Sequence, residues 1–480
     1  MLIHEIYEAH DGDRILFRDH GARITYGQFR EQVRQFRNYL HHVGVQPGEN
    51  VGLYCKNCPE FVAAYFAVVS LGAVIVPLNR TLTPREVTYI AEDAGMKHII
   101  ALQPLDLDQG IRQLLIPEMV EACGRRAFPD APQAAMDEQA PCTIIYTSGT
   151  TGRPKGAMLT HRNLVSNAQG ISNALDVTGE DNFLCVLPMF HSFAWTATVA
   201  DALLRGGQVT VMEAFQPKDA IKTTREEGVT IVCGVPTMFG YYLSLGSPEA
   251  YEKVRLFVSG GASLPGEIIA SFKEKFGIDI TEGYGLSEAS PVVSVNRIGK
   301  VRPGTIGLPL EDIEVRIEAP DGTLLPPGEV GELVTRGPNV MLGYYHQPEA
   351  TAAALVDGWL HTGDMAKLDE EGYITIVDRL KELIIVSGLN VYPREVEEVL
   401  YQFPGVQEAA VIGVPDKLRG EVPCAYIVLK EGAGFDRRAM MKHLQENLAN
   451  FKLPKDIVVL EALPKNATGK IMKRELKAQA

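Results

Sequence analysis

Residues 142–156 read Cys142-Thr143-Ile144-Ile145-Tyr146-Thr147-Ser148-Gly149-Thr150-Thr151-Gly152-Arg153-Pro154-Lys155-Gly156. The first five residues are an apolar run that predicts a buried strand, and residues 157–160 predict a second strand that passes into a helix near Thr160. The glycines between these strands let the backbone approach a ligand closely. The hydroxyl groups and Lys155 supply hydrogen-bond donors that suit phosphate oxygens. We therefore expect a phosphate-binding loop here rather than a solvated hairpin.

The surroundings of the lysine separate this loop from a Walker A motif. Lys155 follows Arg153-Pro154 instead of a glycine, and neither Ser nor Thr comes after it. A Walker A loop requires both features. The sequence therefore predicts a phosphate-binding loop of another class.

Strand patterns alternate with helix patterns along most of the chain. Residues 27–42 carry apolar side chains every three to four positions, as an amphipathic helix does, whereas residues 51–54 are a short apolar run typical of a strand. This alternation predicts layered α/β subdomains over about residues 1–300. From about residue 301 to residue 380 the pattern has period two, which predicts a small β-rich, barrel-like unit. Residues 381–480 predict a separate, small α+β domain.

The secondary structure of two N-terminal segments is less obvious from the sequence. Residues 61–78 contain no charged side chain and are long enough for a membrane span. Gly72 and Pro77 interrupt the run, so a buried helix followed by a buried strand is the better prediction. Residues 104–140 are rich in proline and predict an irregular surface connection, with a helical piece around residues 111–122.

Charge and cysteine content exclude several classes of protein. The net charge is −14, and the chain has no long basic block, which argues against a nucleic-acid partner or an anionic membrane surface. Seven cysteines in 480 residues do not form a disulfide framework, and the first residues do not resemble a signal peptide. We therefore expect a protein of the reducing cytoplasm without a transmembrane segment.

Further motifs follow the glycine-rich loop in a fixed order. They are Pro188-Met189-Phe190-His191, Gly260-Gly261-Ala262, Tyr284-Gly285-Leu286-Ser287-Glu288, Trp359-Leu360-His361-Thr362-Gly363-Asp364, Asp378-Arg379-Leu380-Lys381, Ser387-Gly388-Leu389-Asn390 and Thr468-Gly469-Lys470. Their set and order resemble the adenylate-forming superfamily, which comprises acyl-CoA synthetases, stand-alone adenylation domains and beetle luciferases. The residues of the motifs are most similar to those of medium- and long-chain fatty acyl-CoA synthetases, and the resemblance covers nearly the whole chain.

The resemblance implies a two-step reaction that uses ATP, Mg²⁺ and coenzyme A. A carboxylate attacks the α-phosphate of ATP and gives an acyl-adenylate and pyrophosphate, and a thiol then displaces AMP to form a thioester. Two anions meet in the first step, so catalysis should consist mainly of positioning and charge neutralisation. The resemblance also implies that the C-terminal domain is mobile. It leaves the oligomeric state open, with a homodimer as one option.

Roles for individual residues follow from the matching motif positions. The β- and γ-phosphates would be held by Thr147, Ser148, Gly149, Thr150, Thr151, Gly152 and Lys155. The adenine would be stacked by Tyr284 and lined by Gly260, Gly261, Ala262, Glu282, Gly283 and Gly285. Ser287, where threonine is more common, keeps a hydroxyl for the α-phosphate. Glu288 would bind Mg²⁺, and Asp364 and Arg379 would bond the ribose hydroxyls.

The C-terminal domain would supply the catalytic lysine and the hinge. Lys470 matches the position that bridges the substrate carboxylate and the α-phosphate, which suits a compact charge on a flexible stem. Lys381 matches the hinge between the two half-reactions. Ser387, Gly388 and Leu389 would face the thiol after the hinge turns, although Leu389 departs from the glycine or phenylalanine expected there.

The acyl pocket is expected around His191. Phe190, Phe193, Trp195 and Leu286 would line it and favour an apolar chain or ring. His191 would gate the pocket or orient the carboxylate, with a satisfied core histidine as the rival interpretation. No acidic residue lies between Pro188 and Ala200, which disfavours an amino-acid substrate because its ammonium group would be unpaired.

The leading hypothesis is therefore an ATP-dependent acid:CoA ligase that acts on a medium- or long-chain fatty acid. One alternative is an aryl-acid:CoA ligase. Another is an adenylating enzyme that loads a carrier protein. A nucleotide-binding protein without catalysis is less consistent with the joint presence of Lys155, Glu288 and Lys470.

Overall fold

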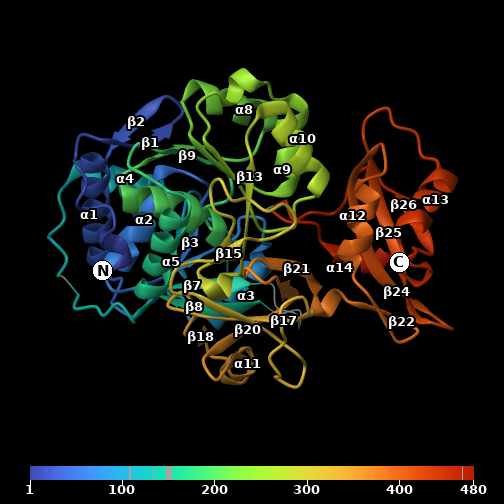
Figure 1. Ribbon diagram of the computed structural model, residues 1–480. Coiled ribbons are helices and arrows are strands. Elements are labelled where there is room, and N and C mark those ends of the chain that lie inside the picture. The colour runs from blue at the N-terminus through green and yellow to red at the C-terminus, as the bar shows by residue number, and fades with distance from the viewer. Residues whose placement is uncertain (108–109, 133, 148–153, 468, 480) are drawn as a thin grey trace.

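The computed structural model describes residues 1–107, 110–132, 134–147, 154–467 and 469–479. A large N-terminal body of mixed α/β structure is followed by a smaller α+β unit, which stands to one side of the body in Figure 1. This is the α/β class with a small C-terminal unit that the sequence predicts. Within the described residues, no helix combines the length and apolar character needed to cross a membrane.

Two large sheets form the interior of the N-terminal body. The first has the order β15-β14-β13-β12-β11-β9-β10-β1-β2 and the second the order β18-β8-β7-β4-β3-β5-β6. The strands of the first sheet are β1 (Ile15–Asp19), β2 (Ala22–Thr25), β9 (Asn182–Cys185), β10 (Gln208–Val211), β11 (Ile231–Gly234), β12 (Leu256–Ser259), β13 (Ile280–Gly285), β14 (Val292–Val295) and β15 (Leu308–Pro309). Those of the second are β3 (Asn50–Tyr54), β4 (Val74–Pro77), β5 (His98–Ala101), β6 (Arg112–Leu115), β7 (Pro141–Thr147), β8 (Lys155–Thr160) and β18 (Gly343–Tyr344).

Helices accompany these sheets, and some of them begin at a side-chain cap. The Thr83 hydroxyl accepts the backbone N–H of Glu86, and the Thr160 hydroxyl accepts that of Asn163. The helices are α1 (Tyr26–His42), α2 (Pro59–Ser70), α3 (Pro84–Asp93), α4 (Ile116–Arg125), α5 (His161–Ala174), α6 (Ser192–Ala194), a π-helical turn (Trp195–Ala200), α7 (Asp201–Arg205), α8 (Pro217–Glu226), α9 (Pro236–Leu245), α10 (Gly266–Phe276) and α11 (Pro348–Ala354).

The predictions for residues 61–78 and 104–140 differ in how well they agree with the structure. The uncharged run becomes helix α2 followed by strand β4, so the predicted helix-to-strand interpretation is confirmed. The expected irregular connection is wrong in part, because Arg112–Leu115 forms strand β6, parallel to β5, and helix α4 begins only at Ile116. Pairing with β5 across the sheet, which a local pattern does not contain, decides this difference.

A third, antiparallel sheet follows with the order β16-β17-β20-β19, and β21 pairs with β20. Its strands are β16 (Glu314–Glu318), β17 (Gly331–Arg336), β19 (Leu355–Val356), β20 (Trp359–Leu368) and β21 (Ile374–Arg379). The strand order is open in the described residues, so this unit is a sheet where the sequence predicts a barrel-like unit. Between β17 and β19 the chain returns to the second sheet, where Tyr344 pairs with Ala157 of β8.

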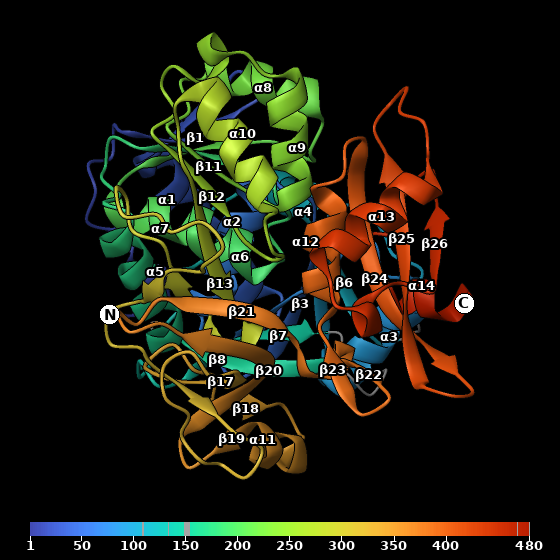
Figure 2. The same ribbon diagram turned by 45° about the vertical axis from the view of Figure 1, so that its right-hand side comes forward.

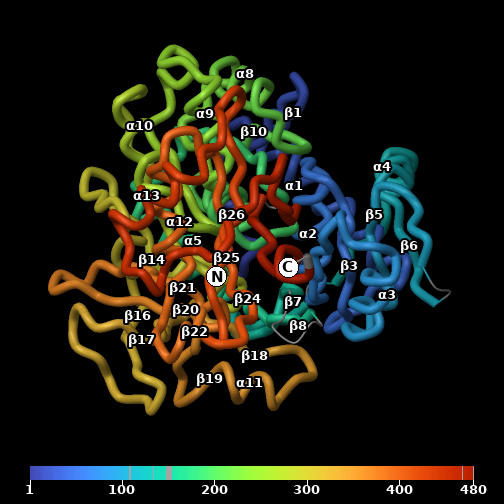
Figure 3. The backbone as a smooth tube through the Cα atoms, turned by 90° about the vertical axis from the view of Figure 1, so that its right-hand side faces the viewer, coloured from blue at the N-terminus to red at the C-terminus, as the bar shows by residue number. Residues whose placement is uncertain are grey.

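The C-terminal unit begins after a short 3₁₀ turn at Leu380–Glu382. Its sheet has the order β23-β22-β25-β24, and β26 pairs with β25. The elements are β22 (Ile384–Val386), β23 (Leu389–Val391), α12 (Pro393–Tyr401), β24 (Val406–Asp416), β25 (Gly420–Leu429), α13 (Arg437–Asn447), β26 (Asp456–Val459) and α14 (Lys473–Gln479). Figure 3 shows this unit in orange and red in front of the body.

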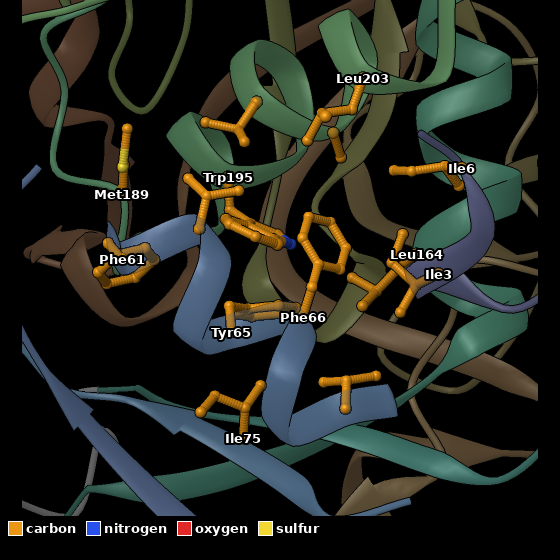
Figure 4. Packing of buried hydrophobic residues seen from close by; sticks show 14 of the residues in the cluster. Ile3, Ile6, Phe61, Tyr65, Phe66, Ile75, Leu164, Met189, Trp195 and Leu203 are labelled. Atoms are coloured by element: carbon orange, nitrogen blue, oxygen red, sulfur yellow. The ribbon is translucent and has the colours of Figure 1, made fainter. Parts of the chain in front are cut away.

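An aromatic cluster packs α2 against the π-helical turn (Figure 4). Trp195 is only 3% exposed, and its ring centroid lies 3.7 Å from that of Tyr65. Phe66 and Phe61 lie against the same indole, at 5.5 Å and 6.1 Å. Rings of this size bury much apolar surface, so the cluster fixes the position of the chain segment that follows His191.

We predict that Trp195→Ala destabilises the N-terminal body by about 3–5 kcal/mol, because it leaves a cavity in a packed core. Chemical unfolding followed by circular dichroism measures the change. Leu418→Ala is the control, because this side chain is 94% exposed and its loss should have little effect. A change for Trp195→Ala as small as that of the control would contradict the core assignment.

Candidate active site

A cavity of about 220 Å³ lies between the body and the C-terminal unit. Helix α12 is on the side of the C-terminal unit that faces the body (Figure 2). The body lines the cavity with Gly261, Ala262, Glu282, Gly283, Tyr284, Gly285, Asp364 and Arg379, and the C-terminal unit with Arg394, Glu397, Glu398, Lys470 and Lys473. Motifs far apart in the sequence therefore meet at the boundary of two structural units.

Strands β12 and β13 deliver the residues predicted to surround a base. Tyr284 lies near the end of β13, and the Gly260 backbone follows β12 directly. A side chain at position 260 would begin 3.1 Å from the ring of Phe193, and one at position 285 would begin 2.1 Å from the Pro291 carbonyl oxygen. These close approaches explain the glycines, because any larger residue would displace the ring or the neighbouring strand.

Asp364 and Arg379 meet because β20 and β21 pair at these two residues. Arg379 Nε lies 3.3 Å from Asp364 Oδ1, and the Tyr284 hydroxyl donates a hydrogen bond of 2.5 Å to Asp364 Oδ2. Burial and the Asp364 charge hold the pKa of Tyr284 well above its ordinary value, so this hydroxyl stays a donor. The Asp364 carboxylate thus lies between the Tyr284 ring, which could stack on a base, and the Arg379 guanidinium, which could bind an anion.

Glu282 is an almost fully buried carboxyl group at the wall of the cavity. Its Oε1 accepts the Leu264 backbone N–H at 3.1 Å, and its Oε2 has no partner among the described residues. Burial raises the pKa of Glu282 to about 7, although Arg394 acts in the opposite direction. A buried oxygen without a partner is costly, and this one is free to accept a hydrogen bond from a bound ligand.

Lys470 extends the C-terminal unit into the cavity. Burial lowers the pKa of its ammonium group to about 8, and the positive charge of Arg379 adds to this effect while Asp364 and Glu382 oppose it. Within the described part of the chain, its Nζ makes no hydrogen bond or ion pair. The ammonium group is therefore available to an anionic ligand.

His191 faces the same region, because Lys470 is among the charges that act on it. Burial first, and then Lys470, lower the pKa of His191 to about 4. Its Nδ1 accepts the Phe193 backbone N–H at 3.2 Å, so the neutral ring carries its proton on Nε2. This nitrogen can donate to a carboxylate. The neighbouring hydroxyls of Ser192 and Ser287 lie 3.3 Å apart, which joins this segment to the motif of Tyr284.

Tyr344 connects Lys155 with Glu288. Its hydroxyl donates to Glu288 Oε1 at 2.8 Å, and the Lys155 ammonium lies 5.1 Å from its ring centre. Both Lys155 and Thr147 border the glycine-rich loop, whose residues 148–153 lie outside the described residues, as does Thr468. The predicted phosphate-binding roles of Ser148, Gly149, Thr150, Thr151 and Gly152 therefore stay predictions.

Several predicted site residues lie apart from the cavity. Trp195 belongs to the aromatic core, where its ring packs against α2 instead of facing the cavity. Ser387, Gly388 and Leu389 form the exposed turn of the β22–β23 hairpin. Lys381 lies in the 3₁₀ turn between the two units, and partial desolvation together with the Arg379 charge lowers its pKa.

The sequence interpretation did not identify Tyr344, Arg394 or Lys473 as site residues. Arg394 donates to the Ile376 carbonyl oxygen at 2.6 Å, which joins α12 to strand β21 of the body. Charged residues on an amphipathic helix usually indicate a solvated face, so the sequence around Arg394 contains no signal of this contact. Tyr344 reaches the site through the return of β18 to the second sheet, which a local pattern does not reveal.

Comparisons with known proteins agree along the whole chain. A family model described as AMP-binding enzyme matches residues 5–345, and one described as AMP-binding enzyme C-terminal domain matches residues 395–470. A feruloyl-CoA synthase of Amycolatopsis sp is 38% identical over 469 residues, covering 95% of this chain and 94% of that protein. A long-chain-fatty-acid–CoA ligase of Bacillus subtilis (strain 168) is 34% identical, covering 97% and 91%.

Solved structures match the chain over its full length. ATP-bound MatB from Rhodopseudomonas palustris is 30% identical, and the match covers 100% of this chain and 99% of that chain with a TM-score of 0.93. The apo form of MatB matches over the same shares with a TM-score of 0.83. Over the whole chain, the likeness to the ATP-bound form is therefore greater than the likeness to the apo form.

We predict that the amine of Lys470 titrates near pH 8, well below the value of about 10.4 for an ordinary lysine. Competitive labelling with acetic anhydride across a pH series, read by mass spectrometry of the peptide, measures this midpoint. Arg379→Gln should move it upward, because a neighbouring positive charge is removed. A midpoint near 10 in the unmodified protein would contradict the desolvated placement.

Proposed function

Because the chain belongs to the family of AMP-binding enzymes and is an AMP-forming acid:CoA ligase, we propose that Lys470 carries its adenylation step. We further propose that its acid is apolar and has a compact acyl group. The observation that carries the first proposal is the ammonium group of Lys470, which lines the interface cavity together with Asp364 and Arg379.

In the first half-reaction, a carboxylate oxygen of the acid attacks the α-phosphorus of ATP. The bond to the bridging oxygen breaks, and pyrophosphate leaves with its electron pair. Lys470 would contact both the carboxylate and the α-phosphate and neutralise the charge that accumulates between them. His191, with its proton on Nε2, would orient the carboxylate. In the second half-reaction, the CoA thiol loses its proton, its sulfur attacks the acyl carbon, and AMP leaves.

Nucleotide recognition would use the residues around the base and ribose. Tyr284 would stack on the adenine, and Asp364 and Arg379 would bond the ribose hydroxyls. Glu282 and the glycines of β12 and β13 would line the base. The partly buried pair of Asp364 and Arg379 supports this assignment, because both groups border the cavity.

Mg²⁺ accompanies ATP in this class of ligase, and Glu288 suits it. One oxygen of this carboxylate accepts the Tyr344 hydroxyl, and the other has no bonding partner among the described residues. A hard cation that prefers oxygen ligands needs little more from the protein, because phosphates and waters complete its shell. When bound, the ion neutralises phosphate charge and favours the departure of pyrophosphate.

A compact acyl group, such as an aryl or arylalkenoic acid, is the first candidate. Trp195 packs against Tyr65, Phe61 and Phe66 in the core, so its indole is not available to line an acyl pocket. The ring near the Gly260 backbone is that of Phe193. The identity to feruloyl-CoA synthase fits this class. The medium- or long-chain fatty acid favoured by the sequence is the second candidate, supported by the likeness to the Bacillus subtilis ligase.

An amino acid fits less well than either class. Asp201 is the first acidic residue after His191, and burial raises its pKa to about 7. Its carboxyl group accepts a hydrogen bond from the Ser172 hydroxyl, and the positive charge of Arg205 acts to lower its pKa. Asp201 is therefore a weak partner for a substrate ammonium group.

The thiol step would require a turn of the C-terminal unit about Lys381. The exposed hairpin of Ser387, Gly388 and Leu389 would then approach the acyl-adenylate from the thiol side. We also propose the cytoplasm as the compartment, in keeping with the seven free cysteines.

We predict that acid-dependent ATP–pyrophosphate exchange with cinnamic or ferulic acid exceeds exchange with octanoic or palmitic acid. The reason is that the feruloyl-CoA synthase is 38% identical to this chain and the long-chain-fatty-acid–CoA ligase 34%. Each acid is assayed with and without CoA. Higher exchange with palmitic acid would favour the fatty-acid candidate, and exchange that depends on none of the acids would contradict the apolar-acid proposal.

We predict that Lys470→Ala lowers this exchange by about 100-fold or more, in keeping with the loss of a preorganised charge. In the unmodified enzyme, exchange should fall as the pH rises through about 8, because the ammonium group is lost there. Lys470→Arg should flatten this alkaline limb, since a guanidinium keeps its charge. Undiminished exchange in Lys470→Ala would refute the assignment.

A further inference from the structure

Lys470 lies in a short hairpin whose two arms are joined by backbone bonds. Lys465 and Ile471 form an antiparallel bridge, the Asn466 N–H donates to the Lys470 carbonyl oxygen at 2.9 Å, and the Met472 N–H donates to Pro464 at 2.8 Å. The ammonium group of Lys470 has no bonding partner of its own among the described residues. Its position is therefore set by what anchors the hairpin.

The two arms are anchored by ion pairs on different elements. On the first arm, Lys465 Nζ lies 2.5 Å from Glu408 Oε1 of β24. On the second arm, Lys473 begins helix α14, and its Nζ lies 3.0 Å from Glu382 Oε2 and 2.8 Å from Glu397 Oε1. Glu382 belongs to the 3₁₀ turn that joins the two units, and Glu397 belongs to α12.

The anchor at Lys473 is not an ordinary surface salt bridge. The side chains of Lys473, Glu382 and Glu397 are 19%, 24% and 16% exposed. Burial opposes the charge of Lys473, but Glu397, Glu382 and Asp378 together raise its pKa above the ordinary value, so it stays charged. Glu397 Oε1 also accepts the Val411 N–H at 2.7 Å, which fixes that carboxylate on β24. Removing one member of a largely buried ion pair leaves a desolvated charge behind. Loss of Lys473 should therefore disturb this anchor more than the loss of a surface ion pair would.

We propose that Lys473 is a positioning residue for adenylation, which holds the Lys470 ammonium group in the cavity by bridging the interdomain turn and helix α12. This inference rests on the role proposed for Lys470. Lys473 acts through the hairpin rather than on the substrate. The two lysines are three residues apart, and both line the cavity. Small displacements of a charged group from the reacting atoms reduce rates steeply.

Lys473→Met should lower the turnover of acid-dependent pyrophosphate exchange by about 10- to 100-fold. Formation of acyl-CoA from chemically prepared acyl-adenylate should change by less than about twofold, because Lys470 acts only in the first half-reaction. Lys473→Arg should restore most of the exchange, since a guanidinium can bond both carboxylates. Lys477→Met is the matched control, because this lysine is exposed on the same helix.

Two further readouts separate positioning from general stability. The labelling midpoint of Lys470 and the alkaline limb of exchange should both move to higher pH in Lys473→Met, because Glu382 loses its nearest cation and acts more strongly on Lys470. The double variant Lys473→Met, Glu382→Gln should recover thermal stability in part, since fewer unpaired charges remain, without recovering exchange.

The inference is overturned if Lys473→Met exchanges within twofold of the unmodified enzyme. It is also overturned if both half-reactions fall together with the melting temperature and Lys473→Arg restores neither. An unmodified enzyme that shows no exchange with any acid refutes the proposed function instead. In that case the labelling midpoint of Lys470 still decides whether Lys473 positions it.

Discussion

The interface cavity depends on one constraint, the partial desolvation of the Lys470 ammonium group between two separately folded units. Taking a lysine charge out of water lowers the pKa of the group. Here burial, with the added positive charge of Arg379, lowers the pKa of Lys470 to about 8. Asp364 and Glu382 offset only part of this cost. The arrangement is therefore prepared for an anion, which would restore the missing electrostatic balance.

The surrounding architecture can be understood as a means of bringing that charge to the correct place. Strands β12 and β13 lead to the cavity with glycines that let the Phe193 ring and the Pro291 backbone pack closely, and β20 and β21 pair so that Asp364 and Arg379 lie side by side. The contact between Arg394 and the Ile376 carbonyl oxygen holds α12 against the body.

Buried charge also distinguishes the groups that bind from those that only support the fold. His191 and Lys470 both have lowered pKa values, first because of burial and then because of a nearby positive charge, which is Lys470 for His191 and Arg379 for Lys470. A neutral histidine beside a charged lysine can donate one hydrogen bond without adding a second charge. Lys473, by contrast, keeps its charge because carboxylates surround it, and this suits an anchor rather than a ligand-binding group.

The sequence by itself determined the local elements and the family. Caps such as Thr83 and Thr160, the period-two pattern after residue 301 and the motifs from the glycine-rich loop to Lys470 depend on near neighbours, and a single sequence contains them. The tertiary structure alone decided which charges meet. Strand β6, the withdrawal of Trp195 into the core, the approach of Tyr344 to Glu288 and the anchoring of Lys473 by Glu382 all depend on long-range packing. Such contacts depend on the mutual arrangement of sheets and units, and no periodicity along the chain records it.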